Sequence, residues 1–281
     1  GRDPWARPDS GLRHSRDTSI KVTSRSHQPI AGSAELVPLT TSARADLVNG
    51  LSRWQVYGRL GWLETKRRYR RTVIGPFWSA VSLAIMVTAL GSIGVGLWNQ
   101  TAATYIPFLA AGLIVWILIQ TIVTESCGLF IANQNLFRQM RLEYSILAYA
   151  LVWRNLIAFG HNLLVYAVAT LLFAPERFGA TILLAPLGLA LVAINAVWIA
   201  LFLGMACLRF RDLQQLVGNL IQVTIFVTPI FWPAELLKSS NRIIFVTLNP
   251  IYHLIEVVRA SGAEVAVEVE KYGIGARVGV E

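Results

Sequence analysis

Polar side chains recur at helical spacing inside stretches of this chain that are otherwise strongly apolar. Arg154, Asn155, His161 and Asn162 fall at i, i+1, i+7 and i+8, so all four lie on one stripe of an α-helix. Such residues are costly within a membrane and usually face a protein interior or a water-filled path. Amide and hydroxyl groups beside aromatic rings suit a sugar chain, because the hydroxyls of sugars hydrogen-bond and their C–H faces lie on the rings.

Two further stripes have the same character. Each combines amide side chains with aromatic rings at helical spacing. An alternative role is hydrogen bonding between helices, which only holds a bundle together. That alternative is the better explanation for any single residue, but we interpret the stripes together as the lining of a translocation path. The members of these two stripes are Asn195, Trp198 and Phe202 in one segment, and Gln215, Asn219, Gln222 and Phe226 in the next.

Motifs for catalysis are missing from the sequence. It contains no G-x-x-x-x-G-K-[ST] loop, no H-E-x-x-H and no G-x-S-x-G, and its four histidines and two cysteines have no metal-ligand spacing. We therefore expect no catalytic residue, metal or cofactor on this chain. A membrane-embedded glycan-processing enzyme would need a reactive carboxylate pair near the interface. The acids predicted on the inner side are Glu125, Glu143 and Asp212, and none has such a motif beside it.

The composition indicates that much of the surface faces lipid. The 281 residues are 54% hydrophobic and 15% charged, whereas a soluble domain carries about 25% charge. The net charge of +9 is concentrated in the N-terminal quarter and short loops, so an anionic inner leaflet is a better partner than nucleic acid.

The fold class follows from the apolar runs, since a helical span needs about 20 apolar residues. A basic cluster, residues 66–71, precedes an uncharged stretch, 72–124, and fixes that junction on the cytoplasmic side. We predict an all-α polytopic membrane protein with a cytoplasmic N-terminus. The five expected spans are 73–98, 105–123, a segment from about 153 to 173, 180–208 and 213–231.

The remaining segments complete the predicted organisation. Residues 1–43 read as a disordered tail, and 44–71 as an amphipathic helix on the inner membrane surface. A soluble amphipathic helix is the alternative, which the adjoining uncharged span disfavours. Residues 72–260 form the transmembrane domain. Within it, 243–258 is too short to span and is cut by Asn249-Pro250, so it fits a re-entrant hairpin. Residues 261–281 are an atypical tail.

Several motifs occur together in one order between about Arg53 and Ala260. They are Lys66-Arg67-Arg68-Tyr69-Arg70-Arg71-Thr72-Val73-Ile74-Gly75-Pro76-Phe77-Trp78, Ile106-Pro107-Phe108-Leu109-Ala110-Ala111-Gly112-Leu113, Val152-Trp153-Arg154-Asn155 with His161-Asn162, Arg209-Phe210-Arg211-Asp212, Thr228-Pro229-Ile230-Phe231-Trp232-Pro233 and Leu248-Asn249-Pro250-Ile251-Tyr252-His253-Leu254. This series resembles the type-2 ABC permeases that export polysaccharides, the O-antigen type most closely.

The resemblance implies a permease homodimer in the bacterial inner membrane, joined to separate subunits that bind ATP and Mg²⁺ and moving a lipid-linked glycan. It also implies roles for two groups of residues. A contact with the ATPase would involve Asn133, Gln134, Asn135, Phe137, Arg138 and Arg141, and an outer gate would involve Trp232, Asn249, Pro250, Tyr252, His253 and Glu256.

The end of the chain departs from the family pattern. The resemblance implies a sixth span after the Asn-Pro-x-Tyr-His segment, where this sequence has the charged, glycine-containing residues 261–281. We interpret this as a truncated or frame-shifted end. A type-2 permease for a small lipid or drug stays open as an alternative; it would need fewer amide and aromatic positions along the path.

Overall fold

The computed structural model describes residues 42–139, 142–175, 185–234 and 243–263, together with Gly1. All regular structure in these ranges is helical, which confirms the predicted all-α class. The tail predicted for residues 1–43 and the atypical segment 261–281 lie almost wholly outside the described residues. So does the predicted outer turn at Glu176 and Arg177.

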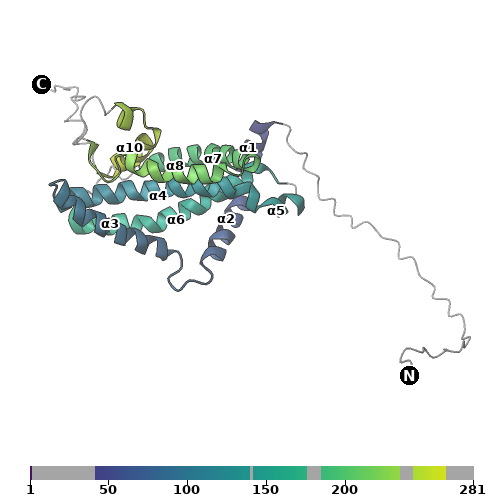
Figure 1. Cartoon of the computed structure of the whole chain (residues 1–281), viewed down its shortest axis with the longest axis horizontal. Coiled ribbons are helices and arrows are strands. Elements are labelled where there is room, and N and C mark those ends of the chain that lie inside the picture. Colours follow the sequence, from purple (N-terminus) through teal and green to yellow (C-terminus); the bar gives the residue numbers. More distant parts are fainter. Residues whose placement is uncertain (2–41, 140–141, 176–184, 235–242, 264–281) are drawn as a thin grey trace, which may run out of the picture. The chain divides into compact units, whose positions relative to one another are not determined.

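Four helices among the described residues are long and apolar enough to cross a membrane. Figure 1 shows them alongside one another, with the shorter apolar helix α8 beside α4 and α7. This arrangement supports a multi-pass membrane protein. The helices are α3 (Phe77–Leu97), α4 (Ala102–Ala132), α6 (Tyr144–Phe173), α7 (Ala185–Arg209) and α8 (Leu213–Val227).

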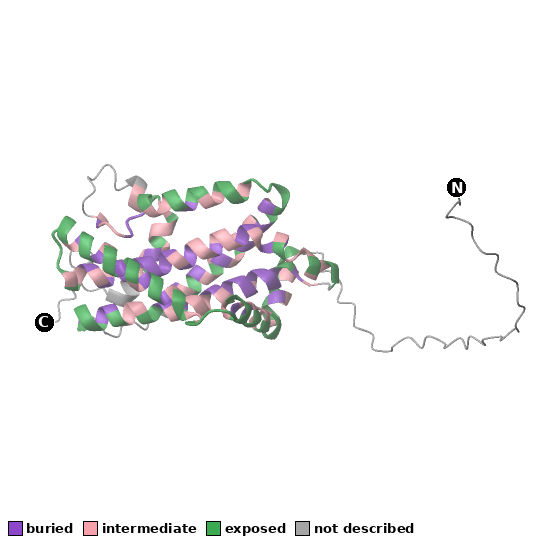
Figure 2. Cartoon of the chain, turned by 60° about the horizontal axis from the view of Figure 1, so that its bottom comes forward, coloured by how far each residue is buried: buried purple, intermediate pink, exposed green. Residues whose placement is uncertain are grey.

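Helix α4 forms the centre of the bundle. In its most apolar stretch 67% of the residues are buried, against 22–28% in α3, α6 and α7; Figure 2 shows that the buried positions lie inside the bundle and the exposed ones on its outer faces. Trp116, Leu109 and Leu113 are almost completely enclosed. The other spanning helices bury one face each against α4 and leave large apolar side chains exposed, as expected where lipid or a partner chain is the neighbour.

Two helices are longer than the sequence suggested. We expected the second span to end near residue 123 and the third to start near 153, whereas α4 continues to Ala132 and α6 begins at Tyr144. Glu125 and Arg154 lie beside these predicted boundaries, and the run 145–173 is also longer than one upright span needs. The charges do not end the helices, because Glu125 and Arg154 neutralise each other across the α4–α6 contact.

The predicted surface helix is divided into α1 (Ala43–Ser52) and α2 (Trp54–Tyr69). The break is at Arg53, whose ψ of 42° is not helical. Both helices pack against α6. Gly61 allows close contact there, since a Cβ at this position would lie 2.9 Å from the carbonyl oxygen of Ala150.

The segment after α8 folds back onto α4. Thr228, Pro229 and Ile230 are buried, and a one-turn π-helix (Ile243–Thr247) leads to α10 (Pro250–Ala263). The predicted break at Asn249-Pro250 is the N-terminus of α10. Asn249 Oδ1 accepts hydrogen bonds from the backbone N–H groups of Ile251 (3.0 Å) and Tyr252 (3.2 Å), and proline suits the first helical position.

Candidate functional site

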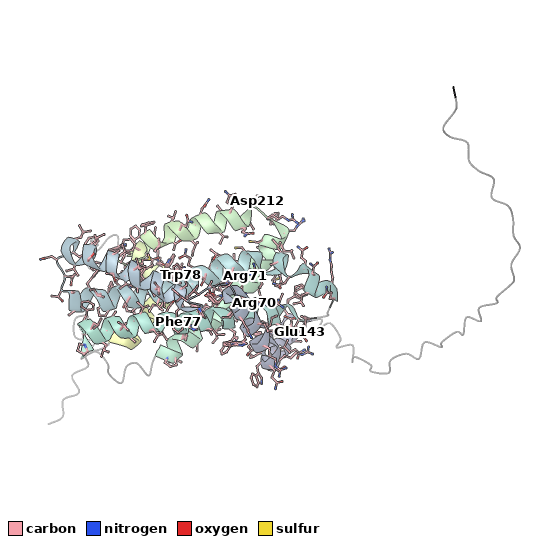
Figure 3. The ribbon with its side chains drawn as sticks, turned by 90° about the horizontal axis from the view of Figure 1, so that it is seen from below. Arg70, Arg71, Phe77, Trp78, Glu143 and Asp212 are labelled. Carbon is pink, nitrogen blue, oxygen red and sulfur yellow. The ribbon has the colours of Figure 1, made fainter. Side chains whose placement is uncertain are left out.

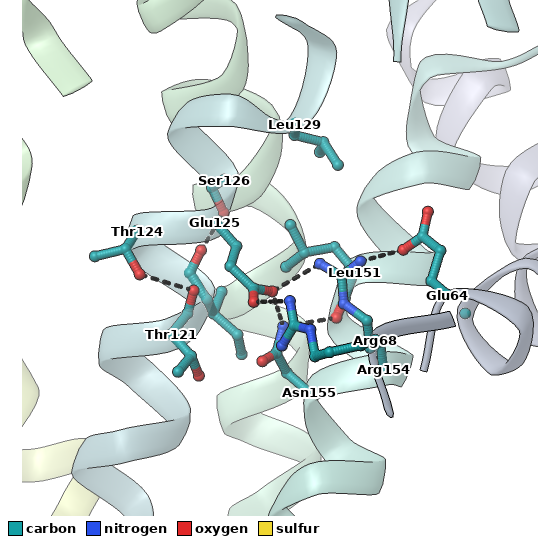
Figure 4. Close-up of polar contacts among 12 residues, drawn as sticks. Glu64, Arg68, Thr121, Thr124, Glu125, Ser126, Leu129, Leu151, Arg154 and Asn155 are labelled. Atoms are coloured by element: carbon teal, nitrogen blue, oxygen red, sulfur yellow. Dashed lines mark hydrogen bonds and ion pairs between the residues drawn. The ribbon is translucent and has the colours of Figure 1, made fainter. Parts of the chain in front are cut away.

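A cluster of two acids and two arginines joins three helices at the α2 end of the bundle (Figure 4). Arg154 of α6 donates to Glu125 of α4 at 2.7 Å and to Glu64 of α2. Arg68, one turn beyond Glu64, donates to the other oxygen of Glu125. Asn155 donates to Glu125 at 2.9 Å. The charges balance, and both oxygens of Glu125 are occupied.

The local sequence explains how α2 reaches this position. Glu64 and Arg68 are four residues apart and therefore lie on one face of α2. Gly61 lets that face approach α6, and the buried hydroxyl of Thr65 donates to the Gly61 carbonyl (2.8 Å) instead of requiring a partner elsewhere. The cluster consequently ties α2 to both α4 and α6.

Electrostatics favour the charged form of the cluster. Partial burial alone would lower the pKa of Arg68, but the hydrogen bond and negative charge of Glu125 outweigh this and raise that pKa above its usual value. Arg154 is mostly buried, and its Nε has no hydrogen-bond partner among the described residues. Removing one carboxylate would therefore leave a poorly solvated guanidinium.

A second polar contact fixes the start of α6. Asp46 of α1 accepts hydrogen bonds from the backbone N–H groups of Tyr144 (3.1 Å) and Ser145 (3.0 Å). The N-cap residue itself, Glu143, makes no side-chain capping bond and pairs with Arg53 at 3.2 Å. Asp46 thus caps α6 from another helix, which no pattern around residue 144 could reveal.

We expect Asp46→Ala to lower the free energy of unfolding by about 1 kcal/mol, the usual cost of a lost cap. Asp46→Asn should fall between wild type and Asp46→Ala, because an amide keeps an acceptor but loses the charge that favours a helix N-terminus. Thermal unfolding of the purified protein in detergent measures both. Equal stability of all three proteins would show that this contact does not hold α6.

The stripe predicted on α6 is divided between several environments. Arg154 and Asn155 belong to the charged cluster. His161 lies at 2.7 Å from the Ile157 carbonyl oxygen, and its ring meets Phe77 edge-on with 5.1 Å between centroids. Asn162 is buried, and its Oδ1 has no partner among the described residues. Four residues assigned to one path are therefore not brought into one lining within this chain.

The stripes on α7 and α8 are each held on one helix face. Asn195 donates to the Leu191 carbonyl (2.9 Å) and accepts from the Trp198 indole (3.3 Å), while Trp198 and Phe202 are exposed. On α8 all the predicted residues are exposed, and the buried Ile221 faces the bundle. These faces remain candidates for a path between two chains. The exposed α8 residues are Gln215, Asn219, Gln222 and Phe226.

The segment expected to contact an ATPase contains α5 (Gln134–Gln139). Phe137 packs against Phe130 and Tyr144, with ring centroids 6.0 and 5.1 Å apart. Asn133 donates to the Leu129 carbonyl at 2.8 Å, Gln134 is half-buried, and Asn135 and Arg138 are exposed. Aromatic packing thus anchors α5 and leaves polar side chains outward; Arg141 lies outside the described residues.

Two of the predicted gate residues connect separate elements. Asn249 donates to the Thr228 hydroxyl at 2.9 Å while it caps α10 at Pro250. Trp232 donates to the Phe226 carbonyl oxygen at 3.2 Å. The Nε2 atom of His253 lies 3.0 Å from the Thr247 carbonyl oxygen. The ring of Tyr252 meets the His253 ring edge-on.

The residue that secures this region, Arg259, is not among those predicted from the sequence. Arg259 of α10 is 2% exposed, pairs with Glu256 at 3.1 Å, and lies 3.8 Å from the centre of the Phe108 ring of α4. Gly112 gives it room, since a Cβ there would collide with the guanidinium. An arginine that follows a short apolar run gives no local sign of burial. The only available signal is on α4, where Gly112 lies one turn from Phe108 and leaves space for a buried side chain.

Cys127 and Cys207, distant in sequence, meet where α4 packs against α7. Both thiols are free and almost fully buried, and the Cys127 thiol donates to the Val123 carbonyl oxygen at 3.4 Å. The described residues contain no cluster of three or more potential metal ligands.

The charged cluster and Arg259 lie within the range that matches a known family, whereas α1 lies outside it. Residues 55–261 match the family described as ABC-2 type transporter. The O-antigen export system permease protein RfbA of Myxococcus xanthus is 23% identical over 193 residues, which is 68% of this chain and 74% of that protein. The range that matches the family, residues 55–261, includes Glu64, Glu125, Arg154 and Arg259.

Proposed function

Because this chain belongs to the ABC-2 type transporter family, and is thus the transmembrane subunit of an ABC transporter, we propose that it exports a lipid-linked polysaccharide. The family implies an ATP-binding subunit as partner. Similarity to an O-antigen export permease supports a glycan as cargo. We propose further that two permease chains form the path in a bacterial inner membrane, with the N-terminus in the cytoplasm.

One observation carries the substrate class: the exposed α8 stripe of three amides and one phenyl ring. Among the described residues these amides have no hydrogen-bond partner, so they remain available for hydroxyl groups. Trp198 and Phe202 on the neighbouring helix add exposed rings. Amides with rings fit a sugar chain better than a purely apolar cargo.

The charged cluster gives this proposal a coupling route. Helix α2 packs against α6, and Glu64, Arg68, Glu125 and Arg154 tie it to two spans. We propose that ATP-driven movement of the partner at α2 and α5 is passed through this cluster to α4 and α6. Glu125 serves there as an ion-pair partner, which disfavours the alternative of a membrane-embedded enzyme with a free carboxylate.

Purification with the ATP-binding subunit, followed by ATPase assays, tests the proposal. We expect a stable complex whose hydrolysis rises when lipid-linked glycan is added. Stimulation by a small amphiphile and not by the glycan would favour a permease for small lipids or drugs. Absence of any complex would contradict the role of transporter subunit for this chain.

We expect the triple substitution Gln215→Leu, Asn219→Leu and Gln222→Leu to reduce glycan export at least tenfold while leaving the melting temperature unchanged. The side chains are exposed and make no internal hydrogen bonds, so stability should not suffer. Three lost hydrogen-bond groups remove enough interaction energy for such a change. Export into proteoliposomes measures this, and Gln214→Leu, on the same helix but off the stripe, is the control. Export at the control's level would exclude these amides from the path.

A further inference from the structure

We propose that the groove between α3 and α6 binds one acyl chain of an anionic bilayer phospholipid whose phosphate group contacts Arg70 and Arg71. This lipid is a resident of the protein and not its cargo. The inference therefore goes beyond the proposed export function and does not depend on the identity of the exported molecule.

The groove is suited to hydrocarbon. Its volume is about 480 Å³, and its lining comes from α3, α6 and Ile106 of α4. The only hydroxyl groups in the lining, on Thr88 and Ser92, donate to carbonyls of their own helix at 2.8 and 2.9 Å. No polar atom there requires an outside partner, and an apolar recess of this kind does not retain water.

The length of the groove also fits an acyl chain. Its α3 residues extend from Phe77 to Ser92, which is about 22 Å of helix at ~1.5 Å per residue. One leaflet contributes about 15 Å of hydrocarbon, half of the bilayer core. An acyl chain that enters at the Phe77 end can therefore lie in the groove along the whole length of the acyl chain.

Unpaired positive charge precedes Phe77, at one end of the groove, by a few residues of sequence. Arg70 and Arg71 are exposed on the loop that leads into Phe77 and Trp78 (Figure 3). Arg70 also lines a cleft of about 350 Å³ with Lys66 and Arg67. Within the described ranges these four cations have no carboxylate partner, whereas Arg53 and Arg68 each have one and Arg154 has two. Basic clusters directly beside a span attract anionic lipid headgroups.

The position of the groove argues against cargo. None of the amide-bearing residues on α7 or α8 contributes to its lining. A molecule held there would contact α3 and α6, and not the exposed faces of α7 and α8 on which the glycan proposal rests. The combination of an apolar recess with adjacent unpaired cations therefore favours a bilayer phospholipid as its occupant.

Native mass spectrometry of the full chain, titrated with dioleoyl phosphatidylglycerol or dioleoyl phosphatidylcholine, tests the proposal. We expect one phosphatidylglycerol to bind tightly to each chain. The lipid concentration that half-saturates this site should be about tenfold lower for phosphatidylglycerol than for phosphatidylcholine, because two arginines favour the anionic headgroup. Arg70→Gln with Arg71→Gln should abolish this preference. Val168→Trp should remove the bound lipid by filling the groove.

Two matched variants separate these effects from general damage. Leu171→Trp adds the same ring to an exposed position of α6 outside the groove, and Arg138→Gln removes an exposed cation on α5; both should bind lipid as wild type does. Equal retention by Val168→Trp and Leu171→Trp would overturn the proposal. If a polyprenyl diphosphate displaced phosphatidylglycerol at a lower concentration, the groove would be a cargo site and the proposal would be wrong. The proposal would also be wrong if Val168→Trp lost a dimer but kept its lipid.

Discussion

Glu125→Gln should lower the free energy of unfolding by about 3 kcal/mol, which is near the cost of breaking a buried ion pair. The substitution removes the negative charge that Arg68 and Arg154 share, and Arg154 is only 16% exposed. Water cannot fully solvate the remaining guanidinium groups. Thermal and denaturant unfolding of the purified protein in detergent measures the loss. Glycan-stimulated ATP hydrolysis by the complex should fall as well, since α2 would no longer be tied to α4.

Asp212→Asn is the matched control. It also removes one carboxylate charge, but from an exposed residue that has no ion pair within the described ranges. Arg68→Gln combined with Glu125→Gln should cost less than the sum of the single changes, because the two residues interact directly. If Glu125→Gln proves no more harmful than the control, the cluster contributes little to the fold or to coupling.

Arg259→Gln should detach α10 from α4 and cost about 3 kcal/mol in stability, again as for a broken buried pair. The guanidinium contacts Glu256, the Phe108 ring and the Ile230 carbonyl oxygen (3.4 Å). Without it, the carboxylate of Glu256 keeps no cationic partner among the described residues. Maleimide labelling of Ile255→Cys, at a fully buried position of α10, should be slow in the parent and fast in the Arg259→Gln background.

Gly112→Val tests the same contact from the α4 side. The added side chain would collide with the guanidinium and lie near Ile230, so it should also accelerate labelling of Ile255→Cys. Val257→Ala, at an exposed position of α10, should leave labelling slow. Slow labelling in both Arg259→Gln and Gly112→Val would mean that α10 is held by its apolar contacts alone.

The sequence was sufficient for the local features of this protein. Runs of uncharged apolar residues predict the spanning helices α3, α4, α6 and α7, since length and hydropathy are properties of one segment. Asn249-Pro250 predicts a break in the apolar run, and α10 begins there because a cap and a proline act within one turn. The ordered motifs predict the ABC-2 family, which the match of residues 55–261 confirms.

Only the tertiary structure decided which residues meet. Glu125 pairs with Arg68, 57 positions away, and Arg154 with Glu64, 90 positions away; Asp46 caps a helix 98 positions away. Helical periodicity placed Arg154 and Asn155 on one stripe with His161, but it could not tell which neighbouring helix the stripe faces. That choice depends on how close two backbones can approach, as at Gly61 and Gly112, and on where a buried charge finds its counter-charge. Both are properties of packed helices, which no single segment of sequence contains.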